Sequence, residues 1–318
     1  MNSLQVDALY HAFVDSLPVD LRPIGADLPY VLRLAPLPGL RFSEVFSHEV
    51  TLSAPAMVAE AFPQVTREAV RFACMAHALA VIEAFGTDRV ADQQIEGTSE
   101  LTAVLEHLRR ARDLALERVF PGASSEAAAA DVRSRDAIRT ERELLRQISS
   151  VDFGRYDQIS LHKQAVGFPA SLALGRAVGA TAQQLAHVER ALAGTWLGIQ
   201  FEDDVIDWED DWRAGGAWAA CIARSLRSKS RGDERPTEPD LVRRAVLGSN
   251  VLLELLERSR RRYRSAWRHA AALGARRLAR WAVEREGKLK ALIPLEAQFA
   301  GYAVRMRRLK PWAAEVLT

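Results

Sequence analysis

The sequence predicts an all-α fold, and three observations carry the prediction. Alanine, leucine, arginine, glutamate and glutamine dominate the middle of the chain, with apolar residues three and four positions apart, which is the period of an amphipathic helix. Between Gln64 and Arg235 the only prolines are Pro121 and Pro169. The period-two runs of β-branched and aromatic residues that predict strands do not occur in the sequence.

The elements follow in order from this pattern. A first helix at 4–16 precedes a proline-rich segment at about 17–55, where five prolines lie among residues 18–38 and disfavour long helices. The apolar spacing then predicts helices in the middle of the chain at 56–61, 66–84, 88–120, 124–149, 156–178 and 181–208. Toward the C-terminus it predicts helices at 217–227, 238–273, 275–292 and 295–308.

Composition narrows the class of protein. A chain of 318 residues with 48% apolar and 26% charged residues is neither disordered nor fibrous, and no linker separates two self-sufficient patterns, so we expect one domain over 1–318. The formal charge of +2 gives no overall field for nucleic acid. Cys74 and Cys221 lie far apart in apolar contexts, which excludes a disulfide framework. We expect a cytoplasmic protein without a leader peptide or a transmembrane helix.

The most informative segment spans residues 200–211. Asp203, Asp207 and Asp211 recur every fourth residue, with Gln200 one turn before them, so they line one face of a helix. Like charges stacked in this way are destabilising unless a cation lies among them. A solvated acidic face is the alternative, but apolar residues flank the segment on most sides. We therefore expect the carboxylates to face a cavity and to bind Mg²⁺.

Two further segments carry candidate residues. Asp88, Asp92 and Glu96 again lie four positions apart, after an apolar stretch, although a surface helix with spaced acids is an equal alternative. Lys163 precedes Pro169 inside a helical pattern, so the helix should kink there. Lys163 could contact an anion as a point charge, or extend from the bundle into solvent.

Together these segments resemble the trans-isoprenyl diphosphate synthases and the class I terpene synthases of the same fold, over residues 66–218. The match to the second aspartate-rich motif, Gln-x-x-Asp-Asp-x-x-Asp, is complete from Gln200 to Asp207. The family's Lys-Thr pair falls on Lys163 and Gln164, and its first motif, Asp-Asp-x-x-Asp, falls on residues 92–96 with Gln93 in place of an aspartate.

The resemblance implies a single large helical bundle of the isoprenoid synthase type, an isoprenyl diphosphate substrate and a homodimer. It implies a cluster of Mg²⁺ ions that bridges the substrate diphosphate. The metal ligands implied are Asp92, Glu96, Asp203, Asp204 and Asp207. Lys163 and Gln200 complete the implied catalytic set. No nucleic acid and no integral membrane association are expected.

Departures from the family select among its reactions. The segment Pro38-Gly-Leu-Arg41 lacks the lysine that chain-elongating members use to hold a second diphosphate, and Arg109-Arg110 lies more than three turns beyond Glu96. We therefore expect a terpene synthase that ionises and cyclises a linear isoprenyl diphosphate and releases diphosphate. A chain-elongating prenyl synthase is an alternative. A non-catalytic helical partner subunit of such an enzyme is another, because Gln93 interrupts the first motif.

Aromatic and basic residues complete the expectations. A carbocation needs a dry cavity with aromatic walls, for which the candidates, each equally a core residue, are Phe72, Phe85, Phe168, Trp196 and Phe201. Trp208, Trp212 and Trp218 are candidates for a lid after the acidic helix. The nine arginines from Arg258 to Arg280 predict a solvated face rather than a nucleic-acid site.

Overall fold

The computed structural model consists of helices throughout the residues it describes, 3–46, 48–91, 93–228 and 239–316, and no strand occurs in these ranges. The all-α prediction is therefore confirmed. The described residues group into two compact units. The single domain expected over 1–318 stays a prediction.

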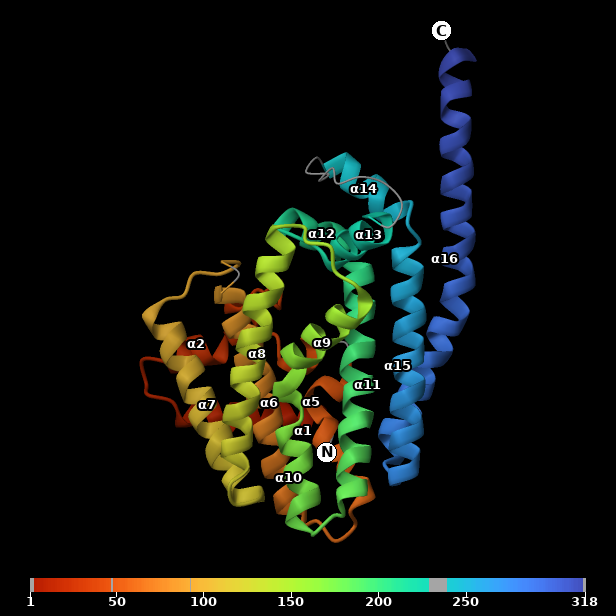
Figure 1. Ribbon diagram of the computed structural model, residues 1–318. Helices are drawn as coiled ribbons and strands as arrows, with labels where there is room; N and C mark the ends of the chain where they lie inside the picture. The colour runs from red at the N-terminus through yellow and green to blue at the C-terminus, as the bar shows by residue number, and fades with distance from the viewer. Residues whose placement is uncertain (1–2, 47, 92, 229–238, 317–318) are drawn as a thin grey trace. The chain divides into compact units, whose positions relative to one another are not determined.

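Unit 1 comprises Met1–Arg135, Gln164–Leu192 and Arg268–Arg280. Its own elements are α1 (Ser3–Ser16), α2 (Arg22–Ala26), α3 (Leu28–Val31), α4 (Phe42–Val45), α5 (Glu49–Val58), η1 (Ala59–Ala61), α6 (Arg67–Ala91), α7 (Ser99–Val119), η2 (Gln164–Gly167) and α10 (Pro169–Ala177). The centre of unit 1 is α6, which packs against α1, α5, α7 and α10 (Figure 1). Gly86 of α6 allows α7 to approach, because a Cβ there would lie 2.5 Å from a methyl group of Leu105.

The proline-rich segment forms short helices that the sequence did not predict. Pro23 and Pro29 lie in the first turns of α2 and α3, where the missing N–H of proline costs no helical hydrogen bond. The Tyr10 hydroxyl donates to the carbonyl of Gly25 at 2.6 Å and ties this segment to α1. Helices of four or five residues are too short to show a 3.6-residue period, which is why the pattern missed them.

Helix α6 is also long and apolar enough to cross a membrane, judged by length and composition alone, and it is the one such helix among the described residues. In the structure, 61% of its most apolar window is buried. The core helix of a folded unit meets the same criterion, so this finding is weak support for a membrane span.

Unit 2 comprises Asp136–Lys163, Ala193–Trp267 and Trp281–Thr318. Its own helices are α9 (Phe153–Lys163), α12 (Trp208–Ala214), α13 (Trp218–Ser228) and α14 (Pro239–Leu247). Four longer helices contribute residues to both units: α8 (Ala123–Arg146), α11 (Ala182–Ile206), α15 (Val251–Leu273) and α16 (Arg276–Val316). The core of unit 2 is aromatic, because Tyr156 stacks on Phe201 at 5.1 Å and packs against Trp218 at 5.0 Å between ring centroids.

Several predicted boundaries are corrected. The kink expected before Pro169 is confirmed as a break, since α9 ends at Lys163, a 3-10 turn follows, and α10 begins at Pro169. The helix expected at 238–273 is two helices, α14 and α15, because Asn250 between them has a φ of 55°, a left-handed conformation that interrupts a helix. The helices expected at 275–292 and 295–308 are one, since α16 continues through Pro294.

Within unit 2, α11 and α15 lie in close contact at two glycines. A Cβ on Gly194 would lie 2.6 Å from the carbonyl oxygen of Arg262, and one on Gly198 would lie 2.5 Å from the Tyr263 ring. The Ser259 hydroxyl donates to the carbonyl of Gly198 at 2.8 Å. These contacts fix the position of the acidic half of α11 in unit 2.

Candidate active site

The acidic row of Asp203, Asp207 and Asp211 is present as predicted, although the helix is interrupted. Helix α11 ends at Ile206 rather than at 208, and Asp207 is the N-cap residue of α12. The Asp207 N–H donates to the carbonyl of Asp203 at 2.8 Å, and the Asp211 N–H donates to that of Asp207 at 2.9 Å. These bonds keep the four-residue register, so all three side chains remain in one row. All three are exposed, so the row does not line the enclosed cavity that we expected from the apolar flanks.

The electrostatics of this row favour a bound cation. Desolvation by the surrounding protein raises the pKa of Asp203 to about 7, helped by Asp207 and Glu202 and opposed by Arg285. Desolvation and Asp207 raise the pKa of Asp211 to about 6, against the opposing charge of Lys163. A raised carboxyl pKa means that the surroundings disfavour the ionised carboxylate. A cation bound beside the row would stabilise the ionised form.

Asp204 has a different environment from the row. It is 5% exposed, the Tyr156 hydroxyl donates to it, and Gln200 Nε2 donates to its Oδ1 at 3.0 Å. Burial, and then the charges of Glu141, Asp211 and Asp207, raise the pKa of Asp204 well above its ordinary value. Because neighbouring residues on a helix point about 100° apart, Asp203 is exposed while Asp204 joins α11 to α9 through Tyr156.

Lys163 is held by a carboxylate that the sequence did not single out. Its ammonium lies 2.9 Å from Glu141 Oε2, and Trp218 Nε1 donates to Glu141 Oε1 at 2.8 Å. Glu141 is only 7% exposed. In the sequence it stands between arginines in a helix rich in charge, where an exposed side chain is the normal expectation, so no sequence signal marked it.

A second buried carboxylate, Glu202, supports the row. It is 4% exposed, accepts a hydrogen bond of 2.7 Å from the Tyr263 hydroxyl and pairs with Arg285. Tyr263 lies on α15 and Arg285 on α16. Glu202 and Asp204 thus anchor the acidic end of α11 to its neighbours and leave Asp203 and Asp207 available.

The first acidic segment, residues 88–96, does not form the continuous helix that we expected. Helix α6 ends at Ala91, Asp92 lies outside the described residues, and Gln93 has a φ of 57°. Glu96 is an exposed residue of the connection to α7, whose N-cap, Thr98, accepts from the Leu101 N–H at 3.2 Å. The continuous helix expected at 88–120 was therefore wrong, because a left-handed residue and a new N-cap end one helix and start another.

No three His, Cys, Asp or Glu side chains converge on a point that could hold a metal ion, within the part of the chain that the structure describes. The donor set nevertheless fits Mg²⁺. This ion keeps several waters and is bound through one or two carboxylates together with substrate phosphates, which is what the exposed Asp203 and Asp207 offer. The Mg²⁺ cluster over both motifs stays a prediction.

The aromatic expectations are partly corrected. Phe201 and Trp196 are buried, whereas Phe85 is 38% exposed and forms no buried wall. Trp208 and Trp218 are 6% and 3% exposed and belong to the core of unit 2, so they do not form a lid. The reason is that α12 and α13 fold back onto the Tyr156–Phe201 stack and bury the indole rings.

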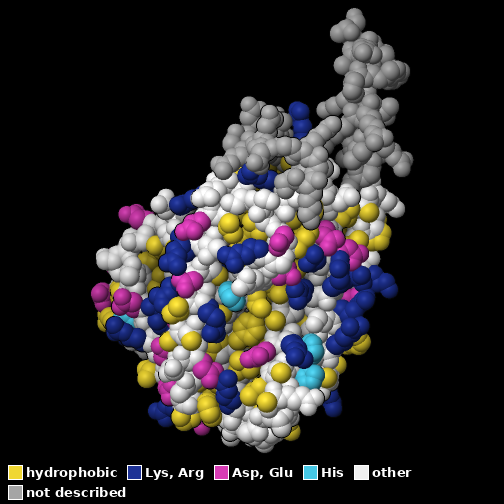
Figure 2. Space-filling model, in the orientation of Figure 1, with side chains coloured by type: hydrophobic (Ala, Val, Ile, Leu, Met, Phe, Trp, Pro, Cys, Tyr) yellow, Lys and Arg dark blue, Asp and Glu magenta, His cyan; other side chains and the backbone are white. Residues whose placement is uncertain are grey.

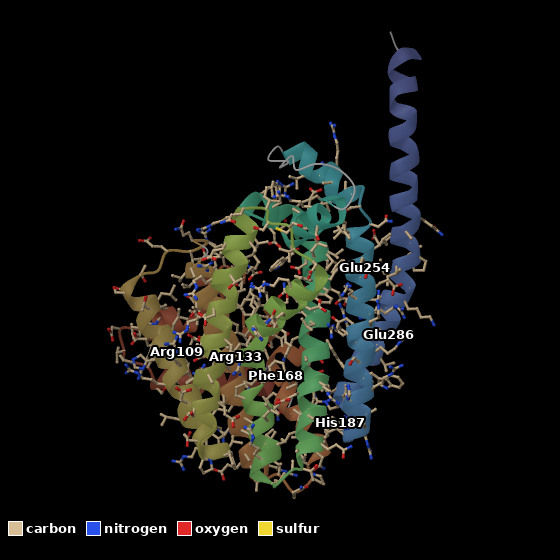
Figure 3. All side chains as sticks on the ribbon, in the orientation of Figure 1. Arg109, Arg133, Phe168, His187, Glu254 and Glu286 are labelled. Carbon is tan, nitrogen blue, oxygen red and sulfur yellow. The ribbon has the colours of Figure 1, made fainter. Side chains whose placement is uncertain are left out.

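Four arginines of α15 form ion pairs with carboxylates of unit 2. Arg258 and Arg262 pair with Asp157, and Arg260 and Arg264 pair with Glu286, which Figure 3 labels on α16. The space-filling view likewise shows arginine and lysine side chains interspersed with acidic ones (Figure 2). These four arginines are half-buried and paired, and the absence of a nucleic-acid site stays a prediction.

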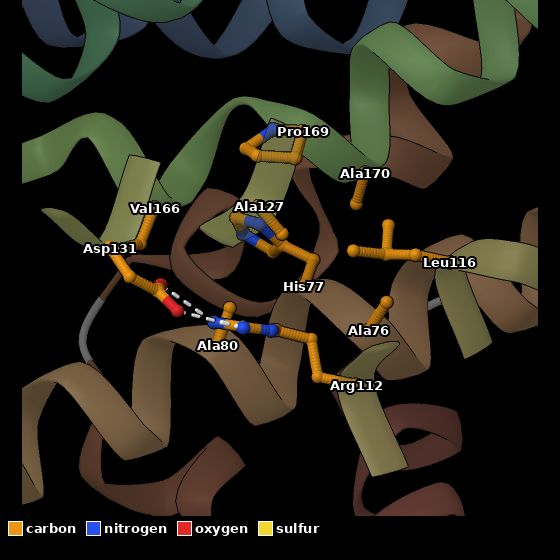
Figure 4. A pocket seen from close by; sticks show the side chains of 10 residues that line it. All are labelled: Ala76, His77, Ala80, Arg112, Leu116, Ala127, Asp131, Val166, Pro169 and Ala170. Atoms are coloured by element: carbon orange, nitrogen blue, oxygen red, sulfur yellow. Dashed lines mark hydrogen bonds and ion pairs between the residues drawn. The ribbon is translucent and has the colours of Figure 1, made fainter. Parts of the chain in front are cut away.

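A small cavity in unit 1 contains no candidate substrate site. It measures about 10 Å³, room for one water molecule, and Arg112 at its wall donates to both oxygens of Asp131 at 2.7 and 2.8 Å (Figure 4). His77 also lines it, and burial lowers the pKa of His77 to about 4. Arg112 is 2% exposed and fully engaged, so this ion pair is part of the core.

The fold is similar to that of known proteins. No family model and no curated protein matches the chain. Among solved structures, a polyprenyl synthase from Caulobacter crescentus CB15, complexed with calcium and isoprenyl diphosphate, is 17% identical with a TM-score of 0.62, over 89% of this chain and 95% of that one. The chain has a polyprenyl synthase-like fold.

Two further solved structures have a similar fold. A polyprenyl synthase from Roseobacter denitrificans (TM-score 0.55) and a decaprenyl diphosphate synthase from Rhodobacter capsulatus (TM-score 0.52) are each 14% identical, over 89% of this chain and 99% of theirs. The fold expected from the aspartate-rich motif is thus confirmed. A likeness at this identity concerns the fold, and the reaction has to be argued from the site.

Proposed function

We propose that the protein is a divalent-metal-dependent enzyme that acts on an isoprenyl diphosphate, with prenyl chain elongation as its reaction. The observation that carries the proposal is the exposed row of Asp203 and Asp207, with raised carboxyl pKa at Asp203, on a polyprenyl synthase-like fold. The similar structures are polyprenyl and decaprenyl diphosphate synthases. They favour elongation over the cyclisation that the sequence placed first.

The residues of the site have distinct parts in this proposal. Asp203 and Asp207, together with Asp92 and Glu96 of the first motif, are the proposed ligands of Mg²⁺. The ion supplies positive charge that stabilises the diphosphate as it leaves the prenyl chain. Asp204 is a positioning residue, because Tyr156 and Gln200 already occupy its oxygens.

Lys163 supplies the remaining positive charge from the protein. Its ammonium is held by Glu141 at 2.9 Å and its charge lowers the pKa of Asp211, so it lies beside the acidic row. A bound diphosphate would compete with Glu141 for this ammonium. Lys163 therefore contacts the diphosphate as a point charge, and Glu141 keeps the side chain oriented when the substrate is away.

Cyclisation is the second candidate, on a specific observation in unit 1. Elongation needs a pocket for a second diphosphate, yet the arginine pair that follows the first motif, Arg109-Arg110, lies next to carboxylates. Arg109 pairs with Glu83 and Arg110 lies 3.6 Å from Glu106. An enzyme that binds one diphosphate and cyclises its chain would not need them.

A single incubation separates the candidates. The purified protein is supplied with Mg²⁺, radiolabelled isopentenyl diphosphate, and geranyl, farnesyl or geranylgeranyl diphosphate in turn. Longer labelled diphosphates support elongation. Hydrocarbon or alcohol with free diphosphate, and no incorporation of label, supports cyclisation. No consumption of any of them contradicts both reactions and leaves the non-catalytic subunit, in a cytoplasmic complex, as the remaining function.

A further inference from the structure

Two histidines outside the acidic site face each other within unit 1. His187 lies near the beginning of α11, where Figure 3 labels it, and His269 lies near the end of α15. Their Nδ1 atoms are 3.0 Å apart, and their ring centroids are 5.2 Å apart with an angle of 49° between the planes. Both side chains are half-buried. The pair joins two helices at a point that neither the aspartate-rich motif nor Lys163 uses.

This geometry restricts the protons of the pair. At 3.0 Å, one Nδ1 must carry a proton and the other must offer a lone pair. With a proton on both Nδ1 atoms, two donors would face each other without an acceptor. Burial lowers the pKa of His269, and the charges of His187, Arg190 and Arg268 lower it further. The lowered pKa of His269 favours its neutral imidazole, which is the form of histidine that binds a metal.

We propose that His187 and His269 form a binding site for a first-row transition metal ion of the Cu²⁺ or Ni²⁺ class, bound through both Nδ1 atoms. Metal–imidazole bonds are about 2.0–2.1 Å long. Two of them at a right angle place the nitrogens about 2.9 Å apart, and at a tetrahedral angle about 3.4 Å. The observed 3.0 Å matches the right angle, which tetragonal Cu²⁺ and Ni²⁺ sites adopt.

Binding of the ion requires a rotation of the two imidazole rings and no movement of the helices. The ion takes the place of the shared proton between the Nδ1 atoms. The ring that carried this proton takes one up on Nε2 from water as it loses the other to water, so both ligands stay neutral imidazoles with no net release of protons, and water molecules complete the coordination. Each imidazole turns about its broad χ2 torsion so that both lone pairs meet at the ion. The exposed Arg190 and Arg268 oppose a divalent ion, but solvent screens charges in such positions. Among the divalent first-row ions, Cu²⁺ stands highest in the order of affinity for such ligands.

The site has a consequence that is independent of the proposed enzyme activity. An ion held by both rings links the start of α11 to the end of α15, and a ligand that binds only the folded state stabilises it by mass action. Binding of Cu²⁺ should therefore raise the unfolding temperature of the protein, and this effect requires both histidines.

The test is a Cu²⁺ titration of the full chain at pH 7.5, followed by electron paramagnetic resonance, with excess Mg²⁺ present to occupy carboxylate sites. The variants are His187→Ala, His269→Ala and His269→Gln. The matched control is His11→Ala, which removes an exposed histidine of α1. Circular dichroism verifies that each variant keeps its helices.

We expect the wild type and His11→Ala to bind one equivalent of Cu²⁺ with coupling to two imidazole nitrogens. His187→Ala and either His269 variant should lose the two-nitrogen signal, lose affinity at least tenfold, and no longer gain thermal stability from Cu²⁺. A wild-type spectrum with one nitrogen or only oxygen ligands overturns the proposal. So does a two-nitrogen signal that survives in a folded His187→Ala variant.

Discussion

The two acidic segments of the chain, residues 88–96 and 200–211, have the same spacing of carboxylates and different structures. In the first, α6 ends at Ala91 and Glu96 lies in an exposed connection. In the second, backbone hydrogen bonds keep the register through Asp207, and buried tyrosines of α9 and α15 bond to carboxylates on two sides of the helix. Spacing of like charges alone therefore does not make a helical face. What decides is whether neighbouring residues give the helix apolar flanks and hydrogen-bond partners.

The largest expected effect comes from removing a carboxylate of the row. Asp203→Asn should lower turnover by about a hundredfold or more, because the charge that binds the metal beside the leaving diphosphate is lost. The helical fold should remain, since Asp203 is exposed. Steady-state kinetics with Mg²⁺ measures the loss. Asp210→Asn is the control, as its side chain is 80% exposed, and equal losses in both variants would contradict a specific role for the row.

A smaller effect is expected at the buried partner of Lys163. Glu141→Gln should destabilise the protein by about 2 kcal/mol, because it removes the charge that offsets a largely desolvated ammonium. Urea unfolding measures it. Glu143→Gln, an exposed change in the same helix, should have no effect beyond error. If Lys163→Met restores stability to the Glu141→Gln variant, the cost is due to the unpaired ammonium; no rescue would contradict this account.

The anchor of Asp204 should contribute about 1–2 kcal/mol. Tyr156→Phe removes the hydroxyl that donates to this buried carboxyl, which leaves an acceptor with one partner fewer. A double-mutant cycle with Asp204→Asn, followed by urea unfolding, isolates the pair. Additive effects of the two changes would show that the hydroxyl does not hold Asp204.

The row also predicts a dependence on pH. The folded pKa values of Asp203 and Asp211, about 7 and about 6, exceed the ordinary value of 3.8, so the folded state binds more protons than the unfolded state between those limits. Stability without metal should therefore fall as pH rises from about 4 to about 7. Mg²⁺ should raise the unfolding temperature more at pH 8 than at pH 5. The Asp203→Asn variant should show a weaker pH dependence, and an equal Mg²⁺ effect at both values would count against the row.

The smallest effect on stability is expected in the first segment. Glu96→Gln should change the free energy of unfolding by less than about 0.5 kcal/mol, because substitutions of exposed side chains in connections remove few contacts. Its effect on turnover tests whether this segment binds metal. Reduced turnover with unchanged stability supports Glu96 as a metal ligand. Unchanged turnover would show that Glu96 is not one.

The sequence predicted those parts of the structure that depend on local pattern. The 3.6-residue period of apolar residues gave the long helices, and Pro169 gave the break after α9. The stacking of Asp203, Asp207 and Asp211 followed from their spacing. Each depends on interactions within four residues, which one chain segment contains.

The remainder depends on contacts between distant segments. Nothing near Glu141 in the sequence indicates that Lys163 and Trp218 will bury it, 22 and 77 residues further on. Asp203 and Asp204 are identical in type and adjacent, yet one is exposed and the other is buried against Tyr156 of α9, and no property of the residues themselves indicates which. The end of α6 was missed because Gln93 adopts a left-handed conformation that its residue type does not require.

Binding of an isoprenyl diphosphate to the row through Mg²⁺ can be measured by a calorimetric titration. A thiolo analogue of farnesyl diphosphate, which resists ionisation, is titrated into the protein with Mg²⁺ and with chelator. The account predicts tight binding with Mg²⁺, binding at least tenfold weaker with chelator, and the same weakening in Asp203→Asn with Mg²⁺ present. Equal affinity with and without Mg²⁺, or an unchanged affinity of the Asp203→Asn variant, would contradict it.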